Sequence, residues 1–445
     1  MLTNRTFNKT LLACLITVSG TSSQAASFQL AEISTSGLLG MAYAGNAAVA
    51  DNASVVATNP ALMTEFKHPQ ISVGGILVDA NVDVSGKING SVDAPHKDII
   101  PNAIVPNIYF VTPINSQFSL GGGLNVNYGL KSQYNDKFNG GMFGGSTKLT
   151  ALNFNLSGAY NLGNGISLGL GLNAIHSDAE INRYLGAGKQ ILIEAGKQAQ
   201  NIIPSLSENT SIAHIKGKKW SLGWNVGLAY QLDENHRWGV AYHAPVDVKF
   251  SGQYSNQLPE ALNPLLQAHS SLKLPISQAT GGKAIPGNLT LNLPAYWELS
   301  GFHKLTDQLA MQYSYKYTGW KRLKSLDAYA NDGKLLFQKI ENFSNSSRYA
   351  IGFSYDVAQD LTLRTGFAYD KNASVKHPSI SIPDTTRTWY SIGATYRFTP
   401  NVSFDVGLAH LRGKKNQFTE GTLVKGAFEV AARANLYGLS ISYGF

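Results

Sequence analysis

The chain has almost no cysteine and no long hydrophobic run, and both absences restrict what it can be. The single cysteine, Cys14, lies inside a short apolar stretch near the N-terminus, Leu11 to Val18. A mature chain that begins after this stretch has no cysteine, which excludes disulfide bonds and thiolate chemistry. No apolar stretch reaches the roughly 20 residues that a membrane-spanning helix needs.

Residues 1–25 have the features of a secretory signal peptide. Arg5 and Lys9 supply the positive charge, Leu11 to Val18 the short apolar core, and Ser23-Gln24-Ala25 the small-x-small cleavage site. Cleavage removes the two basic residues and lowers the formal net charge from +8 to +6. We therefore expect an exported protein whose mature chain begins at residue 26.

From about residue 69 onward, apolar and polar residues alternate in long runs that end in aromatic side chains. In one run Trp220, Leu222, Trp224, Val226, Leu228 and Tyr230 alternate with small or polar residues. This pattern is typical of transmembrane β-strands, whose lipid-facing side chains recur every second residue. A soluble β-sandwich also alternates, but these strands are longer and more numerous, and a signal peptide precedes them.

The last run ends the chain, and it is the most specific signal in the sequence. Its apolar residues are Tyr437, Leu439, Ile441, Tyr443 and the terminal Phe445. A final strand of this kind resembles the recognition signal of the outer-membrane assembly machinery. Residues 69–445, at roughly 27 residues per strand with its turn or loop, give about 14 strands. We predict an all-β protein of the bacterial outer membrane: a monomeric, antiparallel transmembrane β-barrel that contacts lipid and lipopolysaccharide.

The connections between strands are uneven in length. Residues 161–165 and 399–401 predict tight periplasmic turns, whereas residues 184–213 and 255–287 are long insertions that carry many apolar residues. Those side chains either pack the two insertions together or form a landing surface for a hydrophobic ligand at the barrel mouth. The candidates for such an outer groove are Leu192, Ile202, Leu262 and Leu266.

Residues 26–68 do not alternate and are too few to form a core of their own. We expect them to lie in the barrel lumen as a small hatch that occludes it. Near their end, Asn59 predicts an N-cap, with Pro60 in the first turn of a short helix and Ala61 following it.

Several motifs make a family resemblance specific. They are Phe28-Gln29-Leu30, Ser36-Gly37, Ala42 to Gly45, Asp51 to Ala53, Asn59 to Leu62, Val105 to Asn107, Asn127 to Leu130, Asn153 to Tyr160, Leu291 to Pro294 and Ile380 to Asp384. In these motifs the mature chain resembles the FadL family of long-chain fatty acid transporters over essentially its whole length. The resemblance implies a hatch-closed, 14-stranded barrel for the passive uptake of long-chain fatty acids or similar hydrophobic compounds. It also implies an outer groove, a lumenal pocket and lateral release through the wall.

The resemblance further assigns ligand-binding residues. Arg183 and Lys339 correspond to the ligands of the fatty acid carboxylate, and Phe28 is a candidate for the pocket. A fatty acid requires a cation for its headgroup and an apolar slot for its tail. Without the resemblance, both cations read as ordinary residues that face water or lipopolysaccharide.

The lateral opening maps to a kink in the third strand at Asn127, Tyr128 and Gly129. Locally, Gly121 to Gly123 and Gly129 are expected to weaken strand pairing and to permit a bulge.

Other functions fit the sequence less well. A general porin needs an open polar lumen and has no use for a plug, and a receptor role for host cells or phage remains open beside transport. No spacing of Ser, His and Asp singles out a catalytic triad or a metal site, so we predict no enzymatic activity, metal or cofactor. The positive charge does not interleave with aromatic residues, so we expect no nucleic-acid binding.

Overall fold

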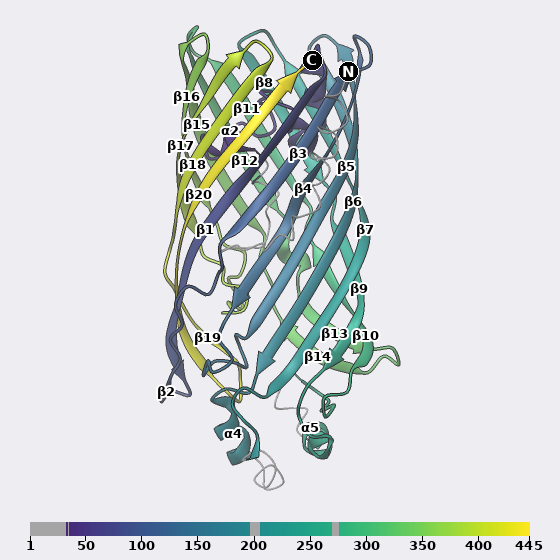
Figure 1. Cartoon of the computed structure of the whole chain (residues 1–445), viewed down its shortest axis with the longest axis vertical. Coiled ribbons are helices and arrows are strands. Elements are labelled where there is room, and N and C mark those ends of the chain that lie inside the picture. Colours follow the sequence, from purple (N-terminus) through teal and green to yellow (C-terminus); the bar gives the residue numbers. More distant parts are fainter. Residues whose placement is uncertain (1–32, 34, 196–204, 269–275) are drawn as a thin grey trace, which may run out of the picture.

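The computed structural model describes residues 33, 35–195, 205–268 and 276–445, which form a tall cylinder of long strands (Figure 1). The expected signal peptide and Phe28 lie outside the described residues. The strands are β1 (Gln70–Ile88), β2 (Val92–Asp93), β3 (Ala103–Pro113), β4 (Phe118–Gln133), β5 (Ser146–Gly163), β6 (Ile166–Tyr184), β7 (Ser211–Gln231), β8 (His236–His243), β9 (Val246–Ser255), β10 (Ile285–Leu293), β11 (Tyr296–Lys304), β12 (Leu309–Thr318), β13 (Ser325–Ala330), β14 (Leu335–Ile340), β15 (Ser346–Ala358), β16 (Leu361–Asp370), β17 (Arg387–Thr399), β18 (Val402–Gly413), β19 (Asn416–Glu420) and β20 (Gly426–Gly444).

The helices are short. They are α2 (Ser36–Leu39), α3 (Val55–Thr58), η1 (Pro60–Glu65), α4 (Gly188–Ala195), η4 (Glu260–Leu262), α5 (Asn263–Ala268) and η6 (Trp320–Arg322). Among the described residues, no helix is long and apolar enough to cross a membrane.

The sheet closes on itself. The first long strand, β1, pairs antiparallel with the last, β20, from Gln70 opposite Gly444 to Ile88 opposite Gly426. Its other neighbour is β3, and from β3 to β7 each strand pairs antiparallel with the next along the chain. The later neighbours in the wall are also antiparallel. Closure leaves no long strand as a free edge of the sheet, which a sheet in lipid requires. The short strands β14 and β19 each pair on one side only, with β13 and β20 respectively.

Nineteen of the strands in the described residues occupy fourteen positions in the wall. β2 is only a short arm beside β1. Five positions hold two strands each, separated by a short interruption: β8 with β9, β10 with β11, β12 with β13, β14 with β15, and β18 with β19. The prediction of about 14 antiparallel strands is confirmed.

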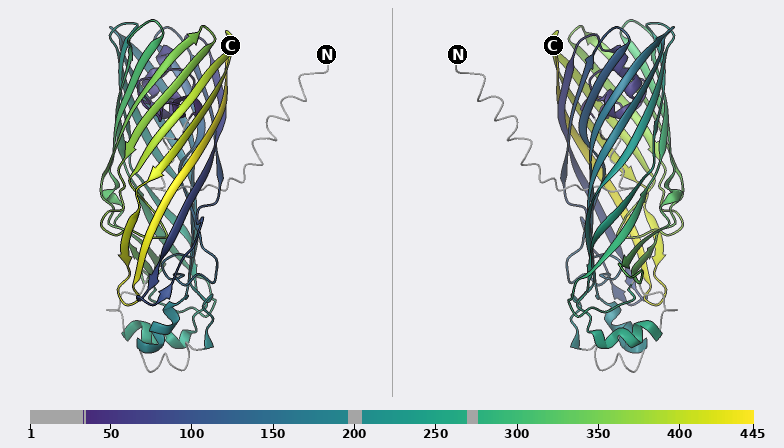
Figure 2. Two further views of the ribbon diagram at one scale, coloured as in Figure 1. Left: turned by 90° about the vertical axis from the view of Figure 1, so that its left-hand side faces the viewer. Right: turned by 90° about the vertical axis from the view of Figure 1, so that its right-hand side faces the viewer.

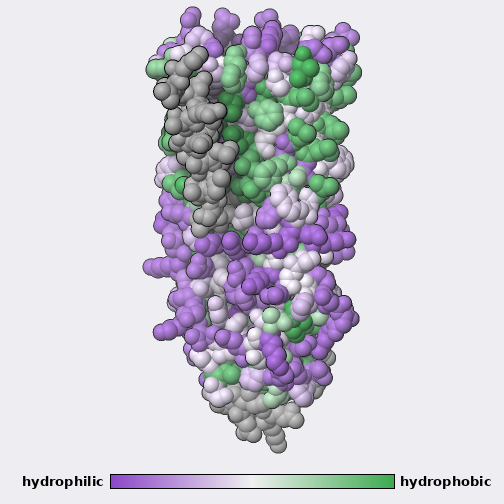
Figure 3. Space-filling view, turned by 45° about the vertical axis from the view of Figure 1, so that its right-hand side comes forward, coloured by the Kyte–Doolittle hydropathy of each residue, from purple (hydrophilic) through white to green (hydrophobic). Residues whose placement is uncertain are grey.

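The alternation in the sequence matches the two faces of the wall. Outward-facing residues of β7 are exposed, from Val226 at 37% to Leu222 at 84%, and those of β20 behave alike. On the face shown in Figure 3, hydrophobic residues gather over the upper part of the barrel beneath a hydrophilic rim, and hydrophilic residues predominate below them. The strands therefore extend well beyond the apolar band at one end.

The two ends of the barrel differ as predicted. At the end that holds the C-terminus, β5 and β6 are joined by a tight turn in which Asn164 and Gly165 have positive φ values of 53° and 76°. Residues 400–401 alone join β17 to β18. The opposite end carries α4, η4 and α5 within residues 185–210 and 256–284 (Figure 1). Short turns face the periplasm in outer-membrane barrels, so the long insertions are extracellular.

Residues 35–66, here called the N-terminal segment, lie inside the barrel near its periplasmic end (Figure 2). Their elements touch strands on opposite sides of the wall: η1 contacts β5, β6 and β7, and α2 contacts β17, β18 and β20. Large side chains in the segment, among them Leu39, Tyr43 and Leu62, are buried. The segment therefore packs across the lumen, as expected for residues without a core of their own.

Neutral hydrogen bonds attach the N-terminal segment to inward-facing hydroxyl groups of the wall. The backbone N–H of Ala53 donates to Ser72 Oγ at 3.1 Å, and that of Ala47 donates to Ser300 Oγ at 3.0 Å. Glycine allows the close approach: a Cβ at Gly239 would lie 1.7 Å from the carbonyl oxygen of Ala47.

Asn59 fixes the last turn of the segment. Its side-chain oxygen accepts from the Ala61 N–H at 3.1 Å, and Pro60 occupies the first turn of η1. Its Nδ2 also donates to the carbonyl oxygens of Ala47 at 2.7 Å and Leu228 at 3.1 Å. The predicted cap is present, and the same side chain joins the segment to the wall.

Candidate ligand-binding site

Arg183 and Lys339 line one cavity at the extracellular end of the barrel. Arg183 lies near the outer end of β6 and Lys339 within β14, strands that are far apart in sequence. The cavity has a volume of about 630 Å³. The structure therefore brings together the two cations that the sequence pointed to only through a family resemblance.

Arg183 is buried without a direct acidic partner. The guanidinium, 2% exposed, donates to the carbonyl oxygens of Asn182 at 2.7 Å and Ser146 at 3.0 Å, and to Thr147 Oγ1 at 3.0 Å. Within the described part of the chain it forms no ion pair. Neutral acceptors solvate the cation but leave its charge available to an anion.

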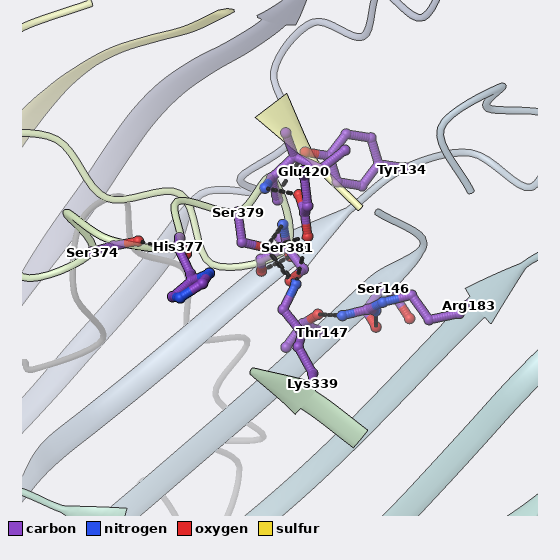
Figure 4. A network of polar contacts seen from close by, with 12 residues as sticks. Tyr134, Ser146, Thr147, Arg183, Lys339, Ser374, His377, Ser379, Ser381 and Glu420 are labelled. Carbon is purple, nitrogen blue, oxygen red and sulfur yellow. Dashed lines mark hydrogen bonds and ion pairs between the residues drawn. The ribbon is translucent and has the colours of Figure 1, made fainter. Parts of the chain in front are cut away.

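Lys339 is already engaged by an acid. Its Nζ donates to Glu420 Oε1 at 2.8 Å and to the hydroxyl of Ser379. Glu420 also accepts from Ser379 Oγ and from the Ile380 N–H, both at 3.1 Å. Figure 4 shows Lys339 directed toward Glu420 and Ser379, while Arg183 points toward Ser146 and Thr147. An anionic ligand at Lys339 must therefore share this cation with Glu420.

The remaining wall of the cavity combines an apolar surface with polar residues, among them Lys376 and His377. Its hydrophobic side chains are Met142, Phe143, Leu266, Ile276, Leu335, Phe337, Ile340, Leu423 and Val424. The second extracellular insertion contributes Leu266 and Ile276, and Ile276 pairs as a β-bridge with Phe337 of β14. The cavity thus combines two cations with a surface suited to a hydrocarbon chain.

A second carboxyl group, Glu341, lies close to these charges and was not anticipated from the sequence. It belongs to the connection between β14 and β15, outside both strands, and is fully buried. Neither carboxyl oxygen has a hydrogen-bond partner among the described residues. Burial raises the pKa of Glu341 to about 7. The positive charge of Lys339 lowers this pKa, and the negative charge of Glu420 raises it. Its position two residues after Lys339 was the only signal in the sequence.

The wall is irregular where the third transmembrane strand, β4, was expected to kink. The pairing of β4 with β5 shifts register between Val126 and Tyr128, which leaves Asn127 as the extra residue of a β-bulge. The pairing of β4 with β3 ends at Leu124 opposite Ile108, whereas its pairing with β5 continues to Gln133. Residues 125–133, including Gly129, therefore run beside β5 without a pairing to β3.

The glycines proposed to cause this kink have another function, so that part of the prediction is wrong. Gly121 to Gly123 pair regularly with both β3 and β5. A Cβ at Gly121 would lie 2.6 Å from Met63 Sδ of the N-terminal segment, and one at Gly123 would lie 2.4 Å from the Tyr109 ring. They provide space for close packing rather than weaken the ladder.

The bulge faces an interrupted part of the opposite wall. Tyr128 is buried, and its hydroxyl donates to the carbonyl oxygen of Pro294, between β10 and β11, at 3.4 Å. Its ring centroid lies 6.5 Å from that of Trp320 in η6. The ring centroids of Trp320 and Phe343 are 5.8 Å apart. Aromatic side chains therefore reach across the lumen from β4 to η6.

The candidates for the outer groove have different surroundings. Leu266 is half-buried and lines the cavity. Leu262 is buried in the hydrophobic core at 4% exposure, so it is not an accessible landing site. Ile202 and the side chain of Leu192 lie outside the described residues, as does Phe28. Among the described residues, no cluster of three or more His, Cys, Asp or Glu is arranged to hold a metal ion.

Relatives cover almost the whole chain. The chain is 54% identical over 439 residues to the 47 kDa outer membrane protein of Pasteurella multocida and 44% identical over 477 residues to outer membrane protein P1 of Haemophilus influenzae. It is 40% identical over 451 residues to the long-chain fatty acid transport protein of Escherichia coli K12. In each case the alignment covers 99% of both chains.

Solved structures share the fold. The crystal structure of a Pseudomonas aeruginosa FadL homologue gives a TM-score of 0.80 at 21% identity and covers 96% of this chain and 100% of its own. The Pseudomonas putida toluene transporter TodX gives 0.67 at 16% identity and covers 92% and 98%. The family model for outer membrane protein transport proteins (OMPP1/FadL/TodX) matches residues 16–445. This chain therefore belongs to the OMPP1/FadL/TodX family of outer-membrane transport channels, a family of transporters rather than enzymes.

Proposed function

We propose that the protein carries long-chain fatty acids or similar hydrophobic compounds passively across the outer membrane. The observation that supports this most directly is the convergence of Arg183 and Lys339 on one cavity whose wall is partly apolar. Two cations can hold a carboxylate by charge-assisted hydrogen bonds, and the apolar wall accepts the tail. The Escherichia coli relative is a long-chain fatty acid transport protein by name, which agrees with this cargo.

The route begins at the extracellular insertions and ends in the wall. A ligand captured near Leu266 passes into the cavity, where its headgroup meets Arg183 and Lys339. Straight passage to the periplasm is closed by the N-terminal segment, which acts as a hatch. The ligand instead leaves sideways at the bulge of Asn127, where β4 runs without pairing to β3. Lateral exit keeps the hydrocarbon tail out of water, since the opening leads into lipid.

Binding of a fluorescent long-chain fatty acid to purified protein in detergent tests the headgroup assignment. The double variant Arg183→Ala, Lys339→Ala should bind at least about 100-fold more weakly, because truncating a buried charge-assisted contact costs about 1.5–3 kcal/mol for each residue. The matched control is Lys218→Ala, Arg322→Ala, which removes the same two residue types from solvent-exposed ion pairs. Unchanged binding in the cavity double variant refutes the assignment.

A further inference from the structure

The structure contains one buried acid in the cavity region that the proposed function leaves unexplained. Glu341 is 0% exposed, and both of its carboxyl oxygens lack a hydrogen-bond partner among the described residues. Only its backbone is fixed, through donation from its N–H to the Lys324 carbonyl oxygen at 2.8 Å. A buried, ionised and unpartnered carboxylate is costly, whereas a neutral carboxyl group in the same place costs far less.

The charges around Glu341 come from three elements of the wall. They are Arg183 from β6, Lys339 from β14 and Glu420 from β19, and each acts electrostatically on Glu341. Lys376 and His377 also line the cavity. Tyr134, which interacts with Arg183 and Glu420, has its pKa raised by burial, so it stays neutral near pH 7.

The balance of these charges depends on Glu341. Among the groups that act on Glu341, Arg183 and Lys339 balance the carboxylates of Glu341 and Glu420, while Lys376 adds a further cation on the cavity wall. Protonation of Glu341 removes one negative charge from this cluster, so an anionic headgroup meets less repulsion. A bound anion therefore favours the protonated form through like-charge repulsion in a buried site.

We propose that Glu341 is a specificity-determining residue that takes up a proton when an anionic headgroup enters the cavity, so that the site binds the anion together with H⁺. This inference rests on the proposed function, because it requires the headgroup to bind beside Arg183 and Lys339. The proton comes from solvent and adds to one carboxylate oxygen of Glu341, which converts the group from an acceptor into a donor. No other group needs to change its protonation state.

The direction of the pH effect follows from linkage. Below the pKa of about 7, Glu341 is already neutral and binding is independent of pH. Above it, the proton must be taken up on binding, and affinity falls by up to about tenfold for each pH unit. The affinity stops falling once the pH exceeds the pKa of Glu341 in the complex, which the bound anion raises.

The test uses dodecanesulfonate, whose headgroup stays anionic across the range, so the probe itself does not titrate. Its dissociation constant is measured from pH 6 to 9 for the full-length protein, for Glu341→Gln, and for the control Glu234→Gln in an exposed turn. We expect the wild type and the control to lose affinity above pH 7. Glu341→Gln, which stays neutral, should keep the low-pH affinity throughout.

Calorimetry of the unmodified protein in buffers of different ionisation enthalpy provides a second measurement that needs no variant. It should show uptake approaching one proton per probe at pH 8. Equal slopes in the wild type and Glu341→Gln overturn the inference, as does a slope abolished by His377→Gln instead. Binding that survives Arg183→Ala, Lys339→Ala refutes the headgroup assignment itself, which separates the two failures.

Discussion

The two halves of the lumen solve the problem of buried polar groups in different ways. In the periplasmic half, the N-terminal segment meets the wall through neutral pairs, such as Ala53 N–H to Ser72 Oγ, and through ion pairs of Asp51 with Arg364 and of Glu65 with Arg237. In the extracellular half, Arg183 has only neutral acceptors, and Glu341 has no side-chain partner among the described residues. The first arrangement pairs the charges of the segment with charges of the wall and favours a closed structure, whereas the second leaves charges that a ligand can complete.

Removal of the N-terminal segment should have the largest effect. Deletion of residues 26–66 removes the N-terminal segment but leaves β1, which begins at Gln70, paired with β20. In planar bilayers we expect little or no steady current through the wild type and sustained ion conductance through the variant. The reason is that water fills the space that the segment occupied. Fatty acid binding at the extracellular cavity should persist in the same variant.

Two outcomes would contradict this expectation. Steady large conductance of the wild type would favour a general porin. Loss of ligand binding together with the segment would show that the two halves are not independent. Heat-dependent migration on gels serves as the control for an intact barrel.

Closing the wall should separate binding from release. Deletion of Asn127 removes the extra residue of the bulge while each later residue of β4 keeps its present partner on β5, as Tyr128 does with Ala151. We expect cellular uptake of a radiolabelled long-chain fatty acid to fall to the level of cells without the protein. Binding to the purified variant should remain unchanged. Asn127→Gly, which keeps the bulge, is the matched control, and uptake that survives the deletion would exclude this exit.

A single side chain, Asn59, tests which interactions hold the N-terminal segment in the lumen. Asn59→Ala loses its cap bond to Ala61 N–H and its two donations to Ala47 and Leu228, which should destabilise the N-terminal segment by about 1–3 kcal/mol. Hydrogen exchange of residues 35–66 should accelerate by roughly 5- to 150-fold as a result. Asn59→Asp keeps the cap acceptor but places a buried carboxylate against the carbonyl oxygens of Ala47 and Leu228, so exchange should accelerate at least as much as in Asn59→Ala. Exchange equal to that of the wild type in both variants would show that packing alone holds the segment.

The sequence was most informative where structure is local. Period-two alternation reports which side chain faces lipid, and therefore the runs through Leu222 and Leu439 predicted both the strands and their outer face. Asn59 and Pro60 predicted a helix start for the same reason. By contrast, the reason for glycine at Gly121 is its close approach to Met63 in the N-terminal segment. Alternation does not show where that segment lies, so the sequence suggests a weakened strand at Gly121 instead.

The cavity depends on contacts that cross the lumen. Lys339, Glu420 and Ser379 come from three separate parts of the chain, and their hydrogen bonds follow from closure of the barrel rather than from any spacing. The family resemblance supplied Arg183 and Lys339 but not Glu341 or Glu420. The interruptions that split five wall strands were also not predicted, since polar residues between strands look like ordinary loops.

The smallest expected effect distinguishes two leucines of the same insertion. Leu266 is half-buried and lines the cavity, so Leu266→Ala removes part of the surface that a hydrocarbon tail would cover. A loss of about 40 Å² of apolar contact at roughly 25 cal/mol per Å² amounts to about 1 kcal/mol, or about fivefold weaker binding. Leu262 is buried, and Leu262→Ala should instead destabilise the insertion by about 2–5 kcal/mol. Leu305→Ala, an exposed leucine in a periplasmic turn, should change neither quantity. If isothermal titration gives the same affinity for Leu266→Ala as for Leu305→Ala, the tail does not lie against this insertion, and the extracellular half recognises its ligand through charge alone.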